Sequence, residues 1–182
     1  MSNIKLNTDL NFMNKFLDFC KDHKWRMVVY GGYGLDGFIG RITRDHGDID
    51  LVVYGQSDRV VASDTITSFI KTKYPKTTII KKSHPFQFEI DVHESGFGLN
   101  LYYVQTNDDP FVNIHTVVKS NGEIVTNDPS IFPPPEKGRL EDTEVEVQNQ
   151  HSHLKDILAK GGASESKYIN DLKLLYPLSS RA

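Results

Sequence analysis

The 182-residue sequence has a single cysteine, Cys20, so no disulfide can form within the chain. It has no apolar run of membrane-spanning length, and its first residues lack the basic-then-apolar pattern of a secretory signal. The formal net charge is only −3, which gives no general attraction to nucleic acid or to an anionic membrane. These absences predict a cytoplasmic protein without a membrane partner and disfavour nucleic acid as its substrate.

The rest of the composition is that of an ordinary globular chain, with 38% hydrophobic and 25% charged residues. Its length suits one domain, and we expect a main domain over residues 1–145 with a helical segment, residues 146–182, packed on it. Hydrophobic spacing and turn residues predict helices over 9–24, 33–39, 60–74, 150–159 and 164–176, and strands over 26–30, 48–54, 77–81, 86–93, 98–105 and 111–118. This order predicts an α+β fold, a mixed sheet flanked by helices.

Two aspartates, Asp48 and Asp50, lie two residues apart on a predicted strand, so their carboxylates face the same side. Their Cα atoms should be about 6.5 Å apart. That spacing suits two hard, oxygen-preferring cations separated by roughly 4 Å. Ile49 and Leu51 should face the core. A polar strand edge facing solvent is the alternative interpretation of the aspartate pair taken alone.

A glycine pair, Gly31-Gly32, ends the preceding strand and opens a predicted helix. Glycines at this position let backbone amides approach a phosphate closely, near the positive end of the helix dipole. The loop that follows carries Arg41, Arg44 and His46, whose donors suit phosphate oxygens. A tight turn with solvated surface charges is the alternative for each part alone. Taken together with the aspartates, the segment predicts a phosphate and metal site.

The same segment resembles the active-site motif of the polymerase-beta-like nucleotidyltransferase superfamily. That motif has a glycine pair after one strand and Asp-x-Asp on the next, as at 31–32 and 48–50 here. The sequence Tyr-Gly-Leu-Asp at 33–36 and the sequence Thr-Arg-Asp-His at 43–46 are similar to the branch that contains aminoglycoside 2''-nucleotidyltransferase and the small lincosamide nucleotidyltransferases. The match is specific over residues 29–53 and weaker elsewhere.

The resemblance implies a polymerase-beta-like nucleotidyltransferase fold with C-terminal helices. It implies magnesium-dependent transfer of a nucleoside monophosphate, AMP from ATP or the equivalent from another triphosphate, to a hydroxyl of a small molecule. An aminoglycoside or lincosamide antibiotic is one candidate acceptor, which would make the protein an antibiotic-resistance factor. The residues implied are Asp48 and Asp50 as ligands of two magnesium ions, and Gly31, Gly32, Thr43, Arg44 and His46 around the triphosphate.

The resemblance also implies a third carboxylate from a later strand, which takes the proton of the acceptor hydroxyl. The most similar segment has Asn113 where aspartate is expected, and an amide can bind magnesium but cannot accept a proton as a carboxylate does. Asp91 is the other candidate, on a predicted strand that alternates apolar and titratable residues. If that strand lies beside Asp48 and Asp50, Asp91 completes the triad. Otherwise it belongs to a solvated strand face.

Three functions therefore stay open at the level of sequence. The first is the transferase itself, and the second is a nucleotide-binding regulatory protein with a degenerate site. The third is a toxin–antitoxin type nucleotidyltransferase that modifies a protein or tRNA. Small relatives are often homodimers, so a homodimer is one expectation for the assembly. Tyr102 and Tyr103 are expected to pack in the core or within a strand.

Overall fold

A mixed seven-stranded sheet forms the centre of the fold in the computed structural model, which describes residues 3–83, 87–94, 97–105, 115–118, 124–127, 135–159 and 166–179. The strands run in the order β3-β4-β5-β2-β1-β9-β8. They are β1 (Arg26–Tyr30), β2 (Ile49–Gly55), β3 (Thr78–Ser83), β4 (Gln87–Glu94), β5 (Phe97–Gln105), β8 (Glu136–Leu140) and β9 (Thr143–Val147). A separate two-stranded sheet pairs β6 (His115–Val118) with β7 (Ile124–Asn127). The α+β prediction is confirmed.

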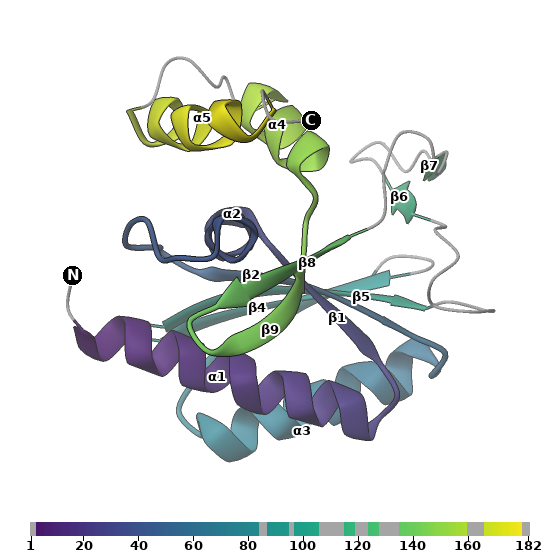
Figure 1. The fold of residues 1–182 in the computed structure, drawn as a ribbon. Helices are drawn as coiled ribbons and strands as arrows, with labels where there is room; N and C mark the ends of the chain where they lie inside the picture. The colour runs from purple at the N-terminus through teal and green to yellow at the C-terminus, as the bar shows by residue number, and fades with distance from the viewer. Residues whose placement is uncertain are drawn as a thin grey trace.

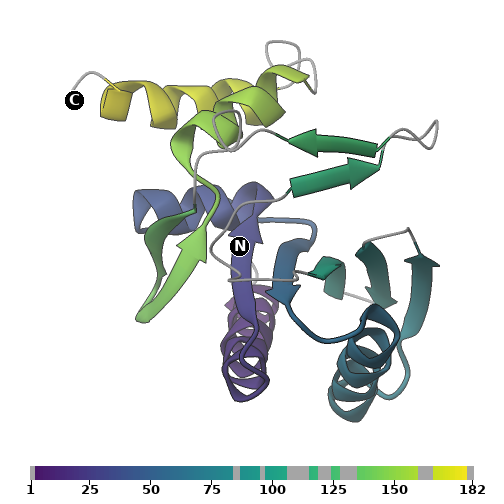
Figure 2. The same cartoon turned by 90° about the vertical axis from the view of Figure 1, so that its right-hand side faces the viewer.

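The central strand β2 is antiparallel to β1 and parallel to β5. β1 in turn is parallel to β9, so the sheet mixes both pairing types. The helices are α1 (Asn3–Asp22), α2 (Gly31–Ile39), α3 (Arg59–Lys73), α4 (Gln150–Ala159) and α5 (Ser166–Ser179). Figure 1 shows α1 and α3 against one face of the sheet and α2, α4 and α5 on the other side. Figure 2 shows the β6–β7 hairpin on the same side as α4 and α5.

The main hydrophobic core lies between the sheet and the helices α1 and α3. Ile49, Leu51 and Val53 of β2 are all fully buried there, as the period-two alternation of a strand predicts. Phe12 and Phe16 of α1 pack into the same cluster. Because alternate residues of a strand face opposite sides, Asp50 faces away from this core, toward Gly31 at the start of α2.

A smaller cluster joins the C-terminal helices to α2, with Leu35 of α2, Ile157 of α4 and Leu175 of α5 at its centre. This contact places α4 and α5 over α2 (Figure 2). The division of the chain at residue 145 stays a prediction. Within the part of the chain that the structure describes, no helix is both long and apolar enough to cross a membrane.

The structure differs from the predicted elements at several places. α1 begins at Asn3, six residues before its expected start at residue 9. α5 continues through Pro177 to Ser179, although the proline was expected to end the helix at residue 176. Pro177 lies in the last turn of α5. Its missing N–H therefore costs the helix one hydrogen bond close to its end and does not interrupt a longer run of such bonds. The β8–β9 hairpin was not predicted, because its turn at Glu141-Asp142 lacks the usual glycine and its strands are rich in charge. Glu141 instead adopts the left-handed conformation itself, with φ of 52°.

Candidate active site

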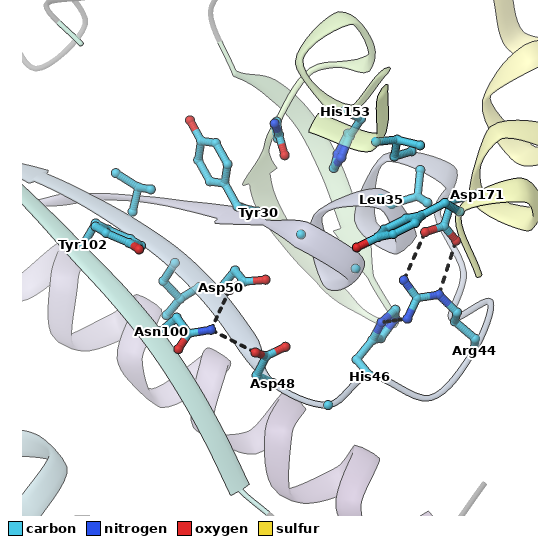
Figure 3. Close-up of a pocket in the computed structure, with 18 residues that line it drawn as sticks. Tyr30, Leu35, Arg44, His46, Asp48, Asp50, Asn100, Tyr102, His153 and Asp171 are labelled. Carbon is cyan, nitrogen blue, oxygen red and sulfur yellow. Dashed lines mark hydrogen bonds and ion pairs between the residues drawn. The ribbon is translucent and has the colours of Figure 1, made fainter. Parts of the chain in front are cut away.

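Asp48 and Asp50 lie side by side and share one hydrogen-bond partner, Asn100 of the neighbouring strand β5. The side-chain amide nitrogen of Asn100 donates to Asp48 Oδ2 at 2.9 Å and to Asp50 Oδ1 at 3.0 Å (Figure 3). The two-residue spacing thus places both carboxylates on one side, as predicted. β2 begins at Ile49, one residue later than expected, so Asp48 ends the preceding loop and is exposed.

The glycine pair lies against this acidic pair because β1 and β2 are antiparallel neighbours, with Tyr30 opposite Asp50. Gly31 has φ of +61°, and a Cβ added there would lie 2.0 Å from Asp50 Oδ2. A Cβ added at Gly32 would lie 2.1 Å from His46 Nδ1. Only glycine therefore lets the chain turn into α2 at this distance from the Asp50 carboxylate and the His46 ring.

The N-terminus of α2 opens toward the same place. Its N-cap residue, Tyr30, makes no side-chain capping hydrogen bond. The first backbone N–H groups of a helix have no partner within the helix, and the helix dipole adds positive potential there. The structure therefore sets backbone donors and a positive dipole end beside two carboxylates. An anion such as a phosphate and a cation could both bind within this short distance.

A second polar cluster is built around Asp36, a fully buried residue of α2. Its Oδ1 accepts hydrogen bonds from the backbone N–H of Thr43 at 3.1 Å and from the Thr43 hydroxyl. Its Oδ2 lies 2.6 Å from His46 Nε2, and His46 Nδ1 lies 2.9 Å from an Nη1 of Arg44. Arginine can only donate, so His46 Nδ1 accepts and its Nε2–H donates to Asp36.

Arg44 is also bound from the opposite end of the chain. Its Nε and Nη2 donate to the two carboxylate oxygens of Asp171 on α5, at 3.2 and 3.1 Å (Figure 3). The chain Asp36–His46–Arg44–Asp171 thus connects α2, the loop before β2 and α5. No sequence pattern pointed to Asp171, because its partner lies 127 residues away.

Tyr33 supports this cluster from the core side. Its ring packs on His46, with centroids 4.4 Å apart, and its hydroxyl donates to Asp9 Oδ2 at 2.7 Å. Burial, together with the hydrogen bond to Asp9, raises the pKa of Tyr33 above its usual range. The hydroxyl therefore stays protonated and keeps its role as a donor.

The aspartate pair and the glycine pair, together with Arg44, His46 and Asp171, line a cavity of about 550 Å³, within the size range of small-molecule sites. The sheet contributes the aspartates with Tyr30 and Tyr102, and the C-terminal helices contribute His153, Ile157, Tyr168 and Asp171. Tyr103 is buried in the core as expected, and Tyr102 is half-buried on β5 and lines the cavity.

The predicted binding residues divide into two groups. Gly31, Gly32, Arg44 and His46 line the cavity together with the aspartates. The Thr43 side chain instead hydrogen-bonds to Asp36 behind the cavity wall, and Arg41 is exposed and does not line it. Neither side chain lines the cavity, and their place near the triphosphate stays a prediction.

Asp91 does not border the aspartate pair. β5 separates its strand β4 from β2, and in the register Asn100 lies between Asp91 and Asp50. The condition under which Asp91 was expected to complete the triad is therefore not met. Asn113 lies outside the described residues. The neighbour of the aspartates is Asn100, signalled in the sequence only as a polar residue between Leu99 and Leu101.

The oxygen atoms of these side chains are of the kind that a hard divalent cation prefers. The site has two carboxylates, one fewer than the three that the resemblance implies. Asp48 and Asp50 offer carboxylate oxygens, and Asn100 carries a carbonyl oxygen on the same amide that now bonds to them. Within the described ranges no group of three or more His, Cys, Asp or Glu residues could hold a metal ion. The amide hydrogens of Asn100 occupy the place where a cation would offset the repulsion of the two carboxylates.

The mixed sheet brings the glycine pair against the paired aspartates at the start of a helix, which is the arrangement that the resemblance implies. The family model for aminoglycoside-2''-adenylyltransferase matches residues 13–151, well over half of the chain. The chain belongs to this family and is a nucleotidyltransferase.

Solved structures with the same fold include two antibiotic-modifying enzymes. Lincosamide antibiotic adenylyltransferase LnuA, solved with lincomycin, is 20% identical with a TM-score of 0.62, covering 90% of this chain and 94% of that one. ANT(2'')-Ia in complex with adenylyl-2''-tobramycin is 16% identical with a TM-score of 0.59, covering 92% and 87%. A solution structure of ANT(2'')-Ia is 15% identical with a TM-score of 0.61, covering 93% of this chain and 83% of that one. No protein of curated function matches in sequence.

Proposed function

We propose that the protein transfers AMP from ATP, with magnesium, to a hydroxyl group of a small molecule. The observation that carries the proposal is the contact between Gly31 and the Asp50 carboxylate, which sets the start of α2 beside the aspartate pair. A phosphate donor and a metal must be adjacent in such a transfer. Membership of a nucleotidyltransferase family supports the same reaction.

Asp48 and Asp50 are the proposed magnesium ligands. When bound, magnesium would orient the triphosphate and make the acceptor hydroxyl more acidic. Backbone N–H groups at Gly31 and Gly32 would bind phosphate oxygens at the positive end of α2. Arg44 would add one charge, held in orientation by its bonds to Asp171 and His46. Thr43 and Asp36 fix the loop that presents these groups.

The proposed acceptor is a hydroxylated small molecule, with aminoglycosides and lincosamides as the first compounds to test. The structural neighbours bind lincomycin and an adenylylated tobramycin. In this chain Tyr102 lines the cavity on one side of Asp50 (Figure 3), and the helices α4 and α5 line it on the other, where Tyr168 and Asp171 offer aromatic and polar surface. Rings with several hydroxyl groups would use both kinds of contact.

A second candidate, a nucleotide-binding protein without turnover, is favoured by one observation. The residue that bridges the aspartates is Asn100, whose amide cannot accept a proton from the acceptor. Such a protein would bind magnesium and nucleotide at the same residues without transferring AMP.

The test is incubation of the purified protein with ATP, magnesium and a panel of aminoglycosides and lincosamides. Pyrophosphate release and an AMP added to the acceptor, detected by mass spectrometry, are the expected result. Asp50→Asn should abolish the product, whereas Asp22→Asn, on the exposed end of α1, should not. Nucleotide binding without product on any acceptor would favour the second candidate instead.

A further inference from the structure

Asn100 belongs to a polar row that crosses the sheet on the cavity side. The register aligns Tyr30 of β1, Asp50 of β2 and Asn100 of β5 in one line. Within this row the Asn100 amide nitrogen has a carboxylate oxygen of Asp48 at 2.9 Å and one of Asp50 at 3.0 Å. The two hydrogens of a single amide thus serve two carboxylates.

This contact offsets an electrostatic cost. Two carboxylates that approach one another closely repel, and a group with partial positive charge between them reduces that repulsion. Hydrogen bonds to ionised oxygens are stronger than those between neutral groups. The amide therefore holds Asp48 and Asp50 in a convergent arrangement without the help of a cation.

A cation at the same carboxylates requires a change at Asn100. The amide hydrogens would face the positive charge, whereas half a turn of the amide plane brings its carbonyl oxygen to the same place. Asn100 can then act as an oxygen ligand, since amide oxygens bind hard divalent cations. The turned amide is neutral, so the three side chains bring a charge of −2 to the cation, where a third carboxylate would bring −3.

We propose that Asn100 is a positioning residue which keeps the aspartate pair assembled in the metal-free protein and lowers the affinity of the pair for divalent cations. The inference rests on the proposed function, because it takes Asp48 and Asp50 as the metal ligands. It predicts a site that is ordered without metal and binds metal weakly. Binding of the cation then competes with two hydrogen bonds inside the protein.

The test measures manganese binding by electron paramagnetic resonance, together with thermal unfolding with and without the metal. Asn100→Asp should bind manganese at least ten-fold more tightly than the wild type, because it adds a charge and removes the competing donors. Without metal its Tm should fall below that of the wild type, and manganese should raise it again. Asn14→Asp, on an exposed position of α1, is the charge-matched control and should bind like the wild type.

Asn100→Ala gives an independent test that adds no charge. It should lower the metal-free Tm, and manganese should restore more of that loss than it adds to the wild type. Asn100→Asp with a manganese affinity within two-fold of the wild type overturns the inference, as does Asn100→Ala with an unchanged metal-free Tm. If Asn100→Asp does not fold, the alanine variant alone decides. Absence of manganese binding in wild type and both variants refutes the proposed metal site itself, and the inference with it.

Discussion

Arg44 and Asp171, which are 127 residues apart in the sequence, form a two-point ion pair between the loop before β2 and the helix α5. The Asp171 side chain is 5% exposed and that of Arg44 is 30% exposed, so the pair is partly shielded from water. The same guanidinium donates to His46, which in turn contacts buried Asp36. The C-terminal helix α5 and the middle of α2 are therefore joined by consecutive polar contacts.

Loss of the Asp171 carboxylate should destabilise the protein measurably. We expect Asp171→Asn to lower the free energy of unfolding by about 1–2 kcal/mol, because two charge-assisted hydrogen bonds from Arg44 lose their ionised acceptor. Urea denaturation measures the change. Asp142→Asn removes the partner of Arg139 in a solvent-exposed pair and should lower the free energy of unfolding much less. Equal costs for the two variants would contradict the role assigned to the Arg44–Asp171 pair.

Substitutions at Gly31 and Gly40 separate the effect of a positive φ angle from the effect of a steric clash with a neighbouring side chain. Both have positive φ, but a Cβ at Gly40 meets nothing within 4 Å, whereas one at Gly31 meets Asp50 Oδ2. Gly40→Ala should therefore cost about 1 kcal/mol of stability and leave nucleotide binding intact. Gly31→Ala should cost more and abolish magnesium-dependent nucleotide binding, since Asp50 must move. Both are measured by urea denaturation and nucleotide titration, and the prediction fails if Gly31→Ala binds nucleotide normally.

Asp36 should be intolerant even of an isosteric amide. Asp36→Asn replaces one acceptor oxygen by an NH2 group. This group must face either the two donors of Thr43 or the Nε2–H of His46, so two donors meet. We expect the free energy of unfolding to fall by about 2–4 kcal/mol. His46 cannot relieve this by moving its proton to Nδ1, because Arg44 donates there. In an Arg44→Met background that change becomes available. The same substitution should then cost about 1 kcal/mol less. A double-mutant cycle with no coupling would argue against the chain of hydrogen bonds from Asp36 through His46 to Arg44.

The buried phenol of Tyr103 should make the protein less stable at high pH. Burial raises the pKa of Tyr103 to about 12, and its hydroxyl donates to the carbonyl oxygen of Ser57 at 2.9 Å. The unfolded chain loses this proton near pH 10 while the folded chain keeps it. The contribution of Tyr103 to the free energy of unfolding should therefore be constant below pH 10 and should fall between about pH 10 and 12. Tyr103→Phe should reduce the slope in urea denaturation at increasing pH, and an unchanged slope would contradict the prediction.

The features that could be predicted from sequence are those set by near neighbours in the chain. The spacing of Asp48 and Asp50 predicted a shared side, and the glycine pair predicted close approach at a helix start. Alternation predicted that Ile49 and Leu51 are buried, which is confirmed.

The features that were missed depend on which segments become neighbours in space. Asn100 borders the aspartates because β5 pairs with β2, and strand order is not written in a local pattern. Asp91 is on an equally plausible strand, yet it lies one strand further away. Asp171 lines the cavity because α5 packs over it, and Tyr102 lines it because β5 is the neighbour of β2. Hydrophobic periodicity predicts neither of these arrangements.

The central claim is that Asp48 and Asp50 bind magnesium together with a nucleoside triphosphate. Calorimetric titration with a non-hydrolysable ATP analogue, with and without magnesium, tests it most directly. We predict magnesium-dependent binding in the wild type and in Asp22→Asn, and its loss in Asp48→Asn with the circular dichroism spectrum unchanged. Equal nucleotide affinity in folded Asp48→Asn and wild type would contradict the account.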